Sequence, residues 1–507
     1  MLWSRLKVRT DSVAGRRRAL RMLAALAGAA VLPFTRAARA NTAPSSLPDP
    51  RGAGVASARK ITDMIGTNGW ATSPSDLEMW RTMGLTWGRG SVGPGQPDSR
   101  AEPLRVDETG TQFDSNLPSV VIRNNRNGIG SLLLLGYTPR WNASVPGDSN
   151  SAPVDVQVWE RYVDAVVRKY SAPPYNLRYF QIWNEAAGKL SGGMPQATFW
   201  HGPDFDKDDK RSKPYERAMQ DYVEKIHIPA AKIIRRYHAF VVYGGWPDQG
   251  GLANFSKWLQ YRSPVLNERM LDWVDYLDTH YLNVDDFDTL YEQYVRNGPA
   301  RGIWQTEIGD EYMKDPHYLP KYFFRFATWA LDRNWNDPDK YLSMVYHWDG
   351  YEPFRLTHRG PPERTYNVSG KSLIVLRQTV DGSLASFSGP LQFGPGATGI
   401  ALRSGNDVVM QVNAESGWRT VTASGLKAPG SRATRVEWID ALSGVAASPD
   451  DVTSRWEGEM LTIRFRVPDR VNGTNDTKDT KDTNGTNDGK GNGNAAPKHL
   501  AYLVVRA

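Results

Sequence analysis

The chain has 507 residues, of which 40% are hydrophobic and 11% aromatic, and its formal net charge is +7. This length exceeds what one hydrophobic core supports, so we expect one large domain and a smaller one. The composition is typical of a folded globular protein, not of a disordered chain. The absence of cysteine excludes disulfide bonds, thiolate metal sites and a cysteine nucleophile.

The first 40 residues hold the basic excess of the chain. They contain nine basic residues and one acidic residue, a net charge of +8, which leaves −1 for the rest of the chain. The positive charge therefore does not indicate a nucleic-acid partner. A basic start, the apolar run LRMLAALAGAAVLPF and ARA at 38–40 predict an export signal peptide over residues 1–40.

Within this segment, RRRALR resembles a twin-arginine signal with Arg16 and Arg17 as the pair. Ala19 stands where that signal carries phenylalanine, so the general secretory route remains an alternative. No later stretch has the roughly 20 uninterrupted apolar residues of a membrane span. We expect a periplasmic or secreted protein with no membrane span, in which residues 41–58, rich in Pro, Ala and Ser, form a linker.

From residue 59 to 370 the chain repeats one pattern: a short β-rich run, a polar loop and a stretch with helical periodicity. Ser73, Pro74 and Asp76 form a helix-start signature, and residues 156–170 carry an apolar stripe at helical spacing. The β-rich runs occupy 60–70, 84–90, 130–141, 177–185, 240–247, 274–282, 301–309 and 341–350.

Eight such units predict an α/β fold, a (β/α)8 TIM barrel with parallel strands. An open doubly wound sheet is the alternative, but it would more often carry a glycine-rich turn after its first strand, and IGTNGWATSPSD does not match that motif.

The sequence pattern changes in residues 371–507. SLIVLRQTVDG predicts a last helix, and alternating strands such as GIALRSGNDVVMQVNA and MLTIRFRVPD predict a C-terminal antiparallel β-sandwich. Residues 469–497 have almost no apolar side chains, so we expect a disordered loop between the last two strands.

Two carboxylates stand at the ends of predicted strands. Run four ends in Asn184-Glu185, and run seven carries Thr306-Glu307 near its end. The chemistry of a (β/α)8 barrel lies at the C-terminal ends of its strands, and glutamate is unfavourable within strands. A pair of carboxylates across a barrel mouth suits glycosidic bond cleavage.

With these motifs the sequence resembles glycoside hydrolase clan A, the retaining (β/α)8 glycosidases. WNE at 183–185 and QTEIG at 305–309 match the clan's two glutamate motifs in the right order, and the resemblance covers roughly residues 60–370. The barrel-plus-sandwich layout is most similar to family 39 and its neighbours, which act on xylosides, uronides and bacterial exopolysaccharides. Ala186 follows the first glutamate, where many clan members have proline.

The resemblance implies a role for each residue at the strand ends. Glu185 is the expected acid/base and Glu307 the expected nucleophile. Asn184 would bind the hydroxyl next to the anomeric carbon, and Arg89 would hold the nucleophile ionised. Six further positions complete the expected site. His280 and Tyr281 lie around the two glutamates, with their individual roles open. The other four are tryptophans at strand ends: Trp348 as the floor under the bound sugar, and Trp70, Trp141 and Trp246 as candidate subsite walls.

We therefore expect an exported retaining glycoside hydrolase with a carbohydrate substrate, no cofactor and no metal. The substrate would be an oligo- or polysaccharide, such as a bacterial exopolysaccharide or a xylan-type glycan. A non-catalytic carbohydrate-binding barrel is the alternative, although such a protein has no need of two opposed carboxylates. A metal-dependent barrel hydrolase is disfavoured because no His-X-His motif or His/Asp cluster lies at the run ends.

Overall fold

The protein is described by a computed structural model. The described residues are 59–91, 117–186, 200–203, 215–245, 251–309, 315–333, 335, 345–347, 355–358, 365–426, 435–469 and 498–506. The expected signal peptide and linker, and residues 470–497 of the expected loop, lie outside this part of the chain. No helix among the described residues is long and apolar enough to cross a membrane.

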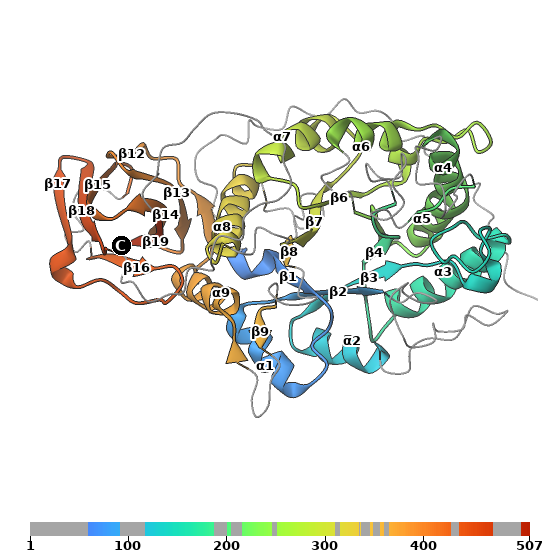
Figure 1. Ribbon diagram of the computed structural model, residues 1–507, viewed down its shortest axis with the longest axis horizontal. Coiled ribbons are helices and arrows are strands. Elements are labelled where there is room, and N and C mark those ends of the chain that lie inside the picture. The colour runs from blue at the N-terminus through green and yellow to red at the C-terminus, as the bar shows by residue number, and fades with distance from the viewer. Residues whose placement is uncertain are drawn as a thin grey trace, which may run out of the picture. The chain divides into compact units, whose positions relative to one another are not determined.

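Eight parallel strands close into a barrel in chain order, so the predicted TIM barrel is confirmed and the open sheet is excluded (Figure 1). Each strand lies in one of the eight predicted runs, except that the second strand extends one residue beyond its run, to Ser91. The strands are β1 (Ile65–Asn68), β2 (Trp87–Ser91), β3 (Gly130–Leu135), β4 (Tyr179–Ile182), β5 (Phe240–Val242), β6 (Tyr276–His280), β7 (Gly302–Ile308) and β8 (Val345–His347).

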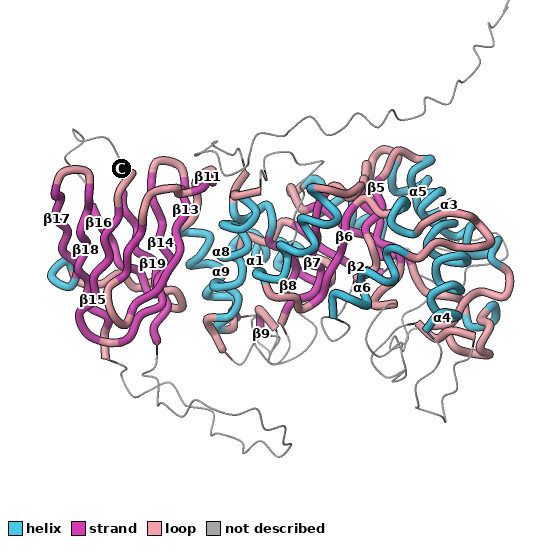
Figure 2. Tube along the Cα trace, turned by 90° about the horizontal axis from the view of Figure 1, so that it is seen from above, coloured by secondary structure: helices cyan, strands magenta, loops and turns pink. Residues whose placement is uncertain are grey.

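Helices surround these strands and cover their outer faces (Figure 2). They are α1 (Pro74–Met83), α2 (Leu117–Arg126), α3 (Val156–Ser171), α4 (Tyr215–Tyr222), α5 (Ile228–Arg236), α6 (Gly251–Gln260), α7 (Phe287–Leu290) and α8 (Tyr318–Leu331). The predicted start of α1 is confirmed, because Ser73 Oγ accepts from Asp76 N at 3.1 Å and Asp76 Oδ2 accepts from Ser73 N at 3.0 Å. The predicted stripe of α3 is buried against the barrel.

Aromatic rings fill the barrel near the N-terminal ends of its strands. Trp87, Tyr179 and Tyr276 are the first residues of β2, β4 and β6, and each contacts the ring of Trp304 in β7. Successive inward positions of a strand are two residues apart. The next inward layer therefore holds the residues two positions later, which are Arg89, Gln181, Asp278 and Thr306. Polar groups thus lie directly above a packed aromatic floor.

A ninth helix, α9 (Val368–Thr379), precedes the second domain, so the expected boundary at 370/371 falls inside this helix. A two-stranded sheet lies just before it, formed by β9 (Thr357–His358) and β10 (Thr365–Tyr366). The first strand of the second domain begins at Leu384.

The second domain consists of two antiparallel sheets, which confirms the predicted sandwich. One sheet has the order β11-β13-β14-β19-β16 and the other β12-β15-β18-β17. Trp438 and Phe465, one from each sheet, stack with their ring centroids 4.8 Å apart. The strands are β11 (Leu384–Ser386), β12 (Leu391–Phe393), β13 (Ala397–Ser404), β14 (Asp407–Glu415), β15 (Gly417–Ala423), β16 (Arg435–Asp440), β17 (Val452–Glu457), β18 (Met460–Val467) and β19 (Lys498–Arg506).

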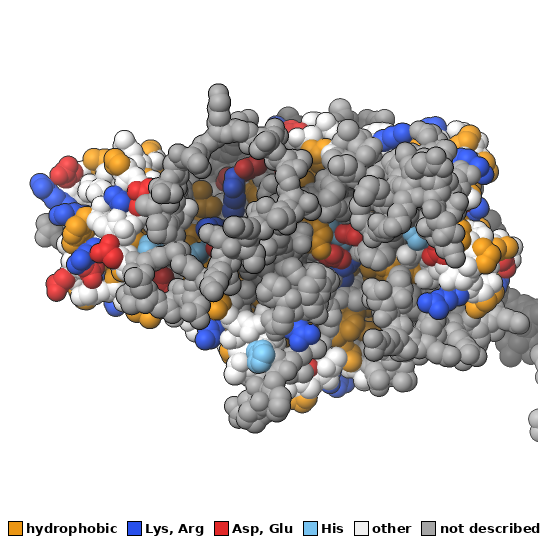
Figure 3. Space-filling view, in the orientation of Figure 1, with side chains coloured by type: hydrophobic (Ala, Val, Ile, Leu, Met, Phe, Trp, Pro, Cys, Tyr) orange, Lys and Arg blue, Asp and Glu red, His pale blue; other side chains and the backbone are white. Residues whose placement is uncertain are grey.

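Helix α8 links the sandwich to the barrel. Gln411 Nε2 of β14 donates to Pro320 O at 2.8 Å, and the rings of Phe324 and Tyr502 lie 6.0 Å apart. On the described surface visible in Figure 3, acidic and basic side chains are interspersed with uncharged ones.

The N-cap of α1 provides a test of the local structure. We predict that Ser73→Ala lowers the free energy of unfolding by about 1 kcal/mol, because it removes the side-chain acceptor for a backbone N–H of the first turn. Urea denaturation measures the effect. Ser75→Ala is the matched control, because it removes the same Ser73–Ser75 hydroxyl contact but leaves the cap intact; an equal loss in both variants would contradict the capping role.

Candidate active site

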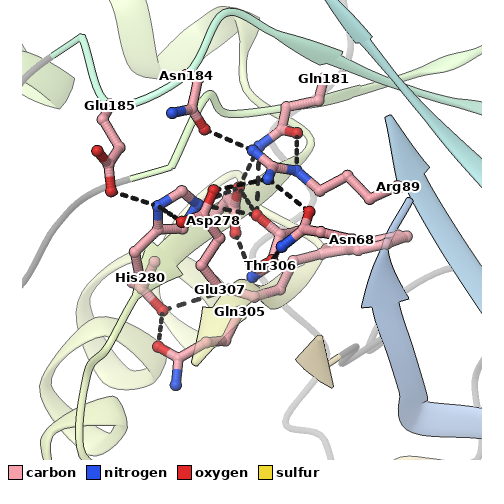
Figure 4. A network of polar contacts seen from close by, with 12 residues as sticks. Asn68, Arg89, Gln181, Asn184, Glu185, Asp278, His280, Gln305, Thr306 and Glu307 are labelled. Carbon is pink, nitrogen blue, oxygen red and sulfur yellow. Dashed lines mark hydrogen bonds and ion pairs between the residues drawn. The ribbon is translucent and has the colours of Figure 1, made fainter. Parts of the chain in front are cut away.

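Arg89 lies at the centre of the polar layer, and its side chain is 5% exposed. Its guanidinium donates four hydrogen bonds to three other strands or their ends (Figure 4). Nε donates to Gln181 Oε1 at 2.7 Å, Nη1 donates to Asn68 Oδ1 and Glu307 Oε1, each at 2.8 Å, and Nη2 donates to Asn184 Oδ1 at 2.6 Å. The predicted contact between Arg89 and Glu307 is therefore present.

The structure separates the roles that the sequence left open for His280 and Tyr281. His280 Nδ1 lies 2.8 Å from Glu185 Oε1 and 3.7 Å from Glu307 Oε2. The Tyr281 hydroxyl donates to Glu307 Oε2 at 2.9 Å. The histidine therefore pairs with the predicted acid/base and the tyrosine with the predicted nucleophile.

The backbone around Glu185 is held in an unusual conformation. Trp183 and Glu185 have φ angles of 65° and 45°, in the left-handed region that non-glycine residues seldom adopt. Trp183 N donates to Leu135 O, and Glu185 N donates to Gly244 O, so the end of β3 and the loop after β5 hold the segment from both sides. The buried ring of Trp183 packs against Tyr137, Trp159 and Trp200. These contacts hold the strained backbone that turns Glu185 toward His280.

Two glycines after β5 make room for this arrangement. Gly245 has a φ of 78°, and a Cβ there would overlap the His280 imidazole. A Cβ on Gly244 would overlap Ile182 O. Glycine is therefore required at both positions for β4 and His280 to approach β5.

A register shift between β6 and β7 determines how Thr306 and Glu307 point. Thr279 pairs with Gln305, but His280 pairs with Glu307, so Thr306 is an extra residue in β7. In a regular strand adjacent residues face opposite sides, whereas a bulge redirects side chains and is frequent beside active sites. Here Thr306 contacts His280 and Asp278, while Glu307 contacts Arg89 and Tyr281.

The two glutamates have pKa values shifted in opposite directions. Burial raises the pKa of the Glu185 carboxyl above its ordinary value, and this effect outweighs the opposing influence of His280. Burial also acts to raise the pKa of Glu307, but the positive charges of His280 and Arg89 and the hydrogen bonds from Arg89 and Tyr281 lower it overall. At a given pH Glu185 therefore favours its protonated form and Glu307 its ionised form.

The predicted tryptophans divide into three cases. The half-buried Trp70 packs on β2, where a Cβ at Gly90 would lie 2.5 Å from its indole ring. Trp141 follows β3 and is 61% exposed, so its ring does not belong to the core. Trp246 and Trp348 lie outside the described residues. The subsite roles of all four tryptophans remain predictions.

The sequence alone did not indicate four buried or half-buried polar residues of the site: Asn68, Gln181, Asp278 and Thr306. Gln181 and Asp278 are polar residues inside otherwise apolar or aromatic runs. Asp278 also precedes His280 by two positions, so the two share one face of β6. Strand alternation counted back from His280 would have found Asp278.

Glu185, His280 and Glu307 each offer one donor atom, and these atoms lie within 4.8 Å of one another. Such proximity also suits a metal ion. Here the donor groups already have partners, since Glu185 contacts His280 and Glu307 accepts from Arg89 and Tyr281. The guanidinium of Arg89 would also repel a cation at this position, so we assign no metal to the cluster.

No protein-family model matches the sequence, and no curated protein matches it. A solved structure with a similar fold is a GH30 endoxylanase from Clostridium papyrosolvens C71, with a TM-score of 0.53 and 14% sequence identity, over 89% of this chain and 98% of that chain. Another is a family 39 glycoside hydrolase from the gut symbiont Bacteroides cellulosilyticus WH2, with a TM-score of 0.48 and 12% sequence identity. The match covers 88% of this chain and 82% of that chain. The first likeness supports the expected fold, and at this sequence identity it shows the fold alone.

The contact between Arg89 and Glu307 makes a prediction about stability. Removing one partner of a buried ion pair costs about 3–5 kcal/mol, so we expect Arg89→Met to lower the free energy of unfolding by about that amount at pH 7. The pKa of Glu307 is lower in the folded protein than in the unfolded chain. The stability that the ionised Glu307 contributes is therefore lost as the pH falls through its pKa in the folded protein. The difference between wild type and variant should therefore be smaller at pH 4.

Urea denaturation at the two pH values measures this. Arg296→Met is the control, because Arg296 forms an exposed pair with Glu292 on one helical turn and should contribute less than about 0.5 kcal/mol. Equal destabilisation by Arg89→Met at both pH values would mean that packing of the side chain, not its charge, is what was lost.

Proposed function

We propose that this protein is a retaining glycoside hydrolase that cleaves O-glycosidic bonds in an oligo- or polysaccharide. One observation carries the proposal. Glu185, just after β4, and Glu307, in β7, each place one carboxylate oxygen within 4.8 Å of the other's, and their pKa values are displaced in opposite directions. Two carboxyl groups about 5–5.5 Å apart are typical of retaining glycosidases, and a separation of about 6.5–9.5 Å is typical of inverting ones. The short separation supports retention.

In the first step, Glu185 donates its proton to the glycosidic oxygen as the bond to the leaving group breaks. Glu307, ionised beside Arg89, attacks the anomeric carbon and forms a glycosyl-enzyme intermediate. A carboxyl whose pKa is raised and a carboxylate whose pKa is lowered match these two tasks. Asn184 accepts a hydrogen bond from Arg89 and directly precedes Glu185 in the chain, and we assign it to bind the hydroxyl next to the reacting carbon.

In the second step, the ionised Glu185 removes a proton from water, and the resulting hydroxide attacks the anomeric carbon from the face that the leaving group vacated. Glu307 then departs as a carboxylate, which Arg89 and Tyr281 stabilise through hydrogen bonds of 2.8 and 2.9 Å. Two inversions at one carbon give net retention.

The substrate class we propose is a β-linked polysaccharide, with xylan-type glycans and bacterial exopolysaccharides first in a test panel. The family resemblance of the glutamate motifs supports this choice, and the solved structure with the similar fold is an endoxylanase. The basic and apolar sequence of residues 1–40 supports export to the periplasm or the medium. Incubation of the purified protein with the panel, followed by analysis of released sugars, tests the activity, and binding without cleavage would favour the non-catalytic alternative.

The nucleophile assignment predicts the outcome of azide rescue. We expect Glu307→Ala to lose turnover of an aryl glycoside and to regain it with azide, yielding a glycosyl azide of inverted anomeric configuration, because azide occupies the space of the missing carboxylate. NMR of the product determines the configuration. A glycosyl azide of retained configuration would assign the nucleophile elsewhere.

The acid/base assignment predicts a different result. We expect Glu185→Ala to hydrolyse natural glycans at least about 100-fold more slowly, because general acid catalysis contributes about 10²–10⁴-fold. Glycosides with very good leaving groups should still accumulate the covalent intermediate, and azide should convert it to a product of retained configuration. Rate measurements with poor and good leaving groups check this, and unchanged cleavage of natural glycans would exclude Glu185 as the acid.

A further inference from the structure

Asp278 is a buried carboxyl that the two catalytic steps above do not use. It lies in β6, is 0% exposed, and accepts three hydrogen bonds (Figure 4). The donors are Gln181 Nε2, the backbone N–H of Thr306 at 3.0 Å from Oδ1, and the Thr306 hydroxyl at 2.8 Å from Oδ2. Its position below His280 makes it the far end of a chain of contacts that leads to Glu185.

Donor and acceptor roles along this chain follow from its fixed ends. The Arg89 guanidinium can only donate, so Gln181 Oε1 faces Arg89 and the amide nitrogen of Gln181 faces Asp278. The backbone N–H of Thr306 can also only donate. Both oxygens of Asp278 therefore face donors. Burial raises the pKa of Asp278 to about 7, and above that pH its carboxylate acts as the acceptor of the network.

The Thr306 hydroxyl transmits this constraint to His280. Because the hydroxyl proton points to Asp278 Oδ2, a lone pair of Thr306 Oγ1 faces His280 Nε2 at 3.0 Å. Nε2 must therefore carry a proton. In a neutral histidine, the hydrogen-bond partner of one ring nitrogen determines whether the other nitrogen carries the proton. With Nε2 protonated, Nδ1 of the neutral ring presents a lone pair to Glu185 Oε1, 2.8 Å away.

This tautomer affects how strongly Glu185 and His280 retain the proton between them. If that proton leaves, an imidazole lone pair faces a carboxylate, which is unfavourable. The pair therefore releases its proton only at higher pH, and the pKa values of both groups are raised. Burial is the largest cause for Glu185, while for His280 the charge of Glu307 is the leading cause that overcomes burial. The other charged groups facing the pair are Asp278 and Arg89.

We propose that Asp278, acting through the hydroxyl of Thr306, fixes the tautomer of His280 and thereby keeps on the Glu185–His280 pair the proton that is delivered to the leaving group. Asp278 and Thr306 are positioning residues in this scheme, because neither touches the substrate. The proposal rests on the glycosidase function proposed above, but the tautomer itself can be measured without any substrate.

Asp278→Asn tests the proposal with little change of shape. The amide oxygen of the new side chain must face the Thr306 N–H, so its NH₂ group faces the Thr306 hydroxyl and also the amide nitrogen of Gln181, which loses its acceptor. The hydroxyl then donates to His280 Nε2, and Nδ1–H becomes a permanent donor to the Glu185 carboxylate. Hydrogen bonding to the charged form lowers a pKa, so the basic limb of the pH profile of kcat/KM should move to lower pH.

The same variant should show a dependence on the leaving group. We expect a loss of about 10–100-fold for glycosides with poor leaving groups, which need the acid, and less than about threefold for 2,4-dinitrophenyl glycosides, which do not. A purely structural role would lower the melting temperature and leave the basic limb where it was, and that result overturns the proposal.

A second pair of variants decides the matter if Asp278→Asn does not fold. Thr306→Val removes the hydroxyl but keeps the shape and leaves Asp278 in place, so its basic limb should also move to lower pH. Thr306→Ser keeps the hydroxyl and should keep the limb within about 0.3 pH unit of the wild-type position, which is a small fraction of the one-unit scatter of histidine pKa values. Equal shifts in the valine and serine variants overturn the proposal.

NMR of protein labelled with 15N-histidine provides the readout that does not depend on activity. The wild type should show a protonated Nε2 on His280, identified by loss of its signal in His280→Gln, and Asp278→Asn should show the proton on Nδ1. An unprotonated Nε2 in the wild type overturns the proposal. Absence of hydrolysis across the glycan panel would instead contradict the proposed function and leave the tautomer result standing.

Discussion

The buried guanidinium of Arg89 is the interaction on which the site depends. A positive charge inside a barrel is costly unless acceptors surround it. Here four side-chain oxygens accept from Arg89, and they come from β1, from β7, and from β4 and the segment just after it. One of the acceptors is Glu307, which is thereby kept ionised, and two are the amides of Gln181 and Asn184, which are thereby oriented. One side chain thus determines the charge of the proposed nucleophile and the direction of the polar groups around it.

The layers of the barrel explain why this charge can be held rigidly. The rings of Trp87, Tyr179, Tyr276 and Trp304 fill the barrel below the polar layer, so the polar side chains have no lower space into which to relax. The residues two positions further along the same strands then form the hydrogen-bonded network. Polar networks in a low-dielectric interior are strong only when every member has a partner, and here donors and acceptors alternate from Arg89 to Asp278 and on to His280.

The two proposed catalytic groups differ because their neighbours differ, not because their burial differs. Both carboxyl groups are removed from water, which raises both pKa values. Arg89 and Tyr281 donate to Glu307, while Glu185 has its close contact with a histidine whose other nitrogen is already engaged by Thr306. Retaining glycoside hydrolysis needs this asymmetry, because one group must begin as an acid and the other as an anion.

The sequence by itself determined the order of eight strand-and-helix units, the following β-sandwich, the helix start at Ser73 and the pair Glu185 and Glu307 at strand ends. These features follow from hydrophobic periodicity and turn residues, which are local properties of the chain. Only the tertiary structure decided that His280 contacts Glu185 while Tyr281 contacts Glu307, since the two residues are adjacent and their spacing is the same in either arrangement. It also decided that the register shift between β6 and β7 turns both Thr306 and Glu307 toward the site, and that Gln181 and Asp278 meet 97 positions apart. Contacts of this kind depend on how the strands align across the barrel, and that alignment depends on packing between segments that are distant in the sequence.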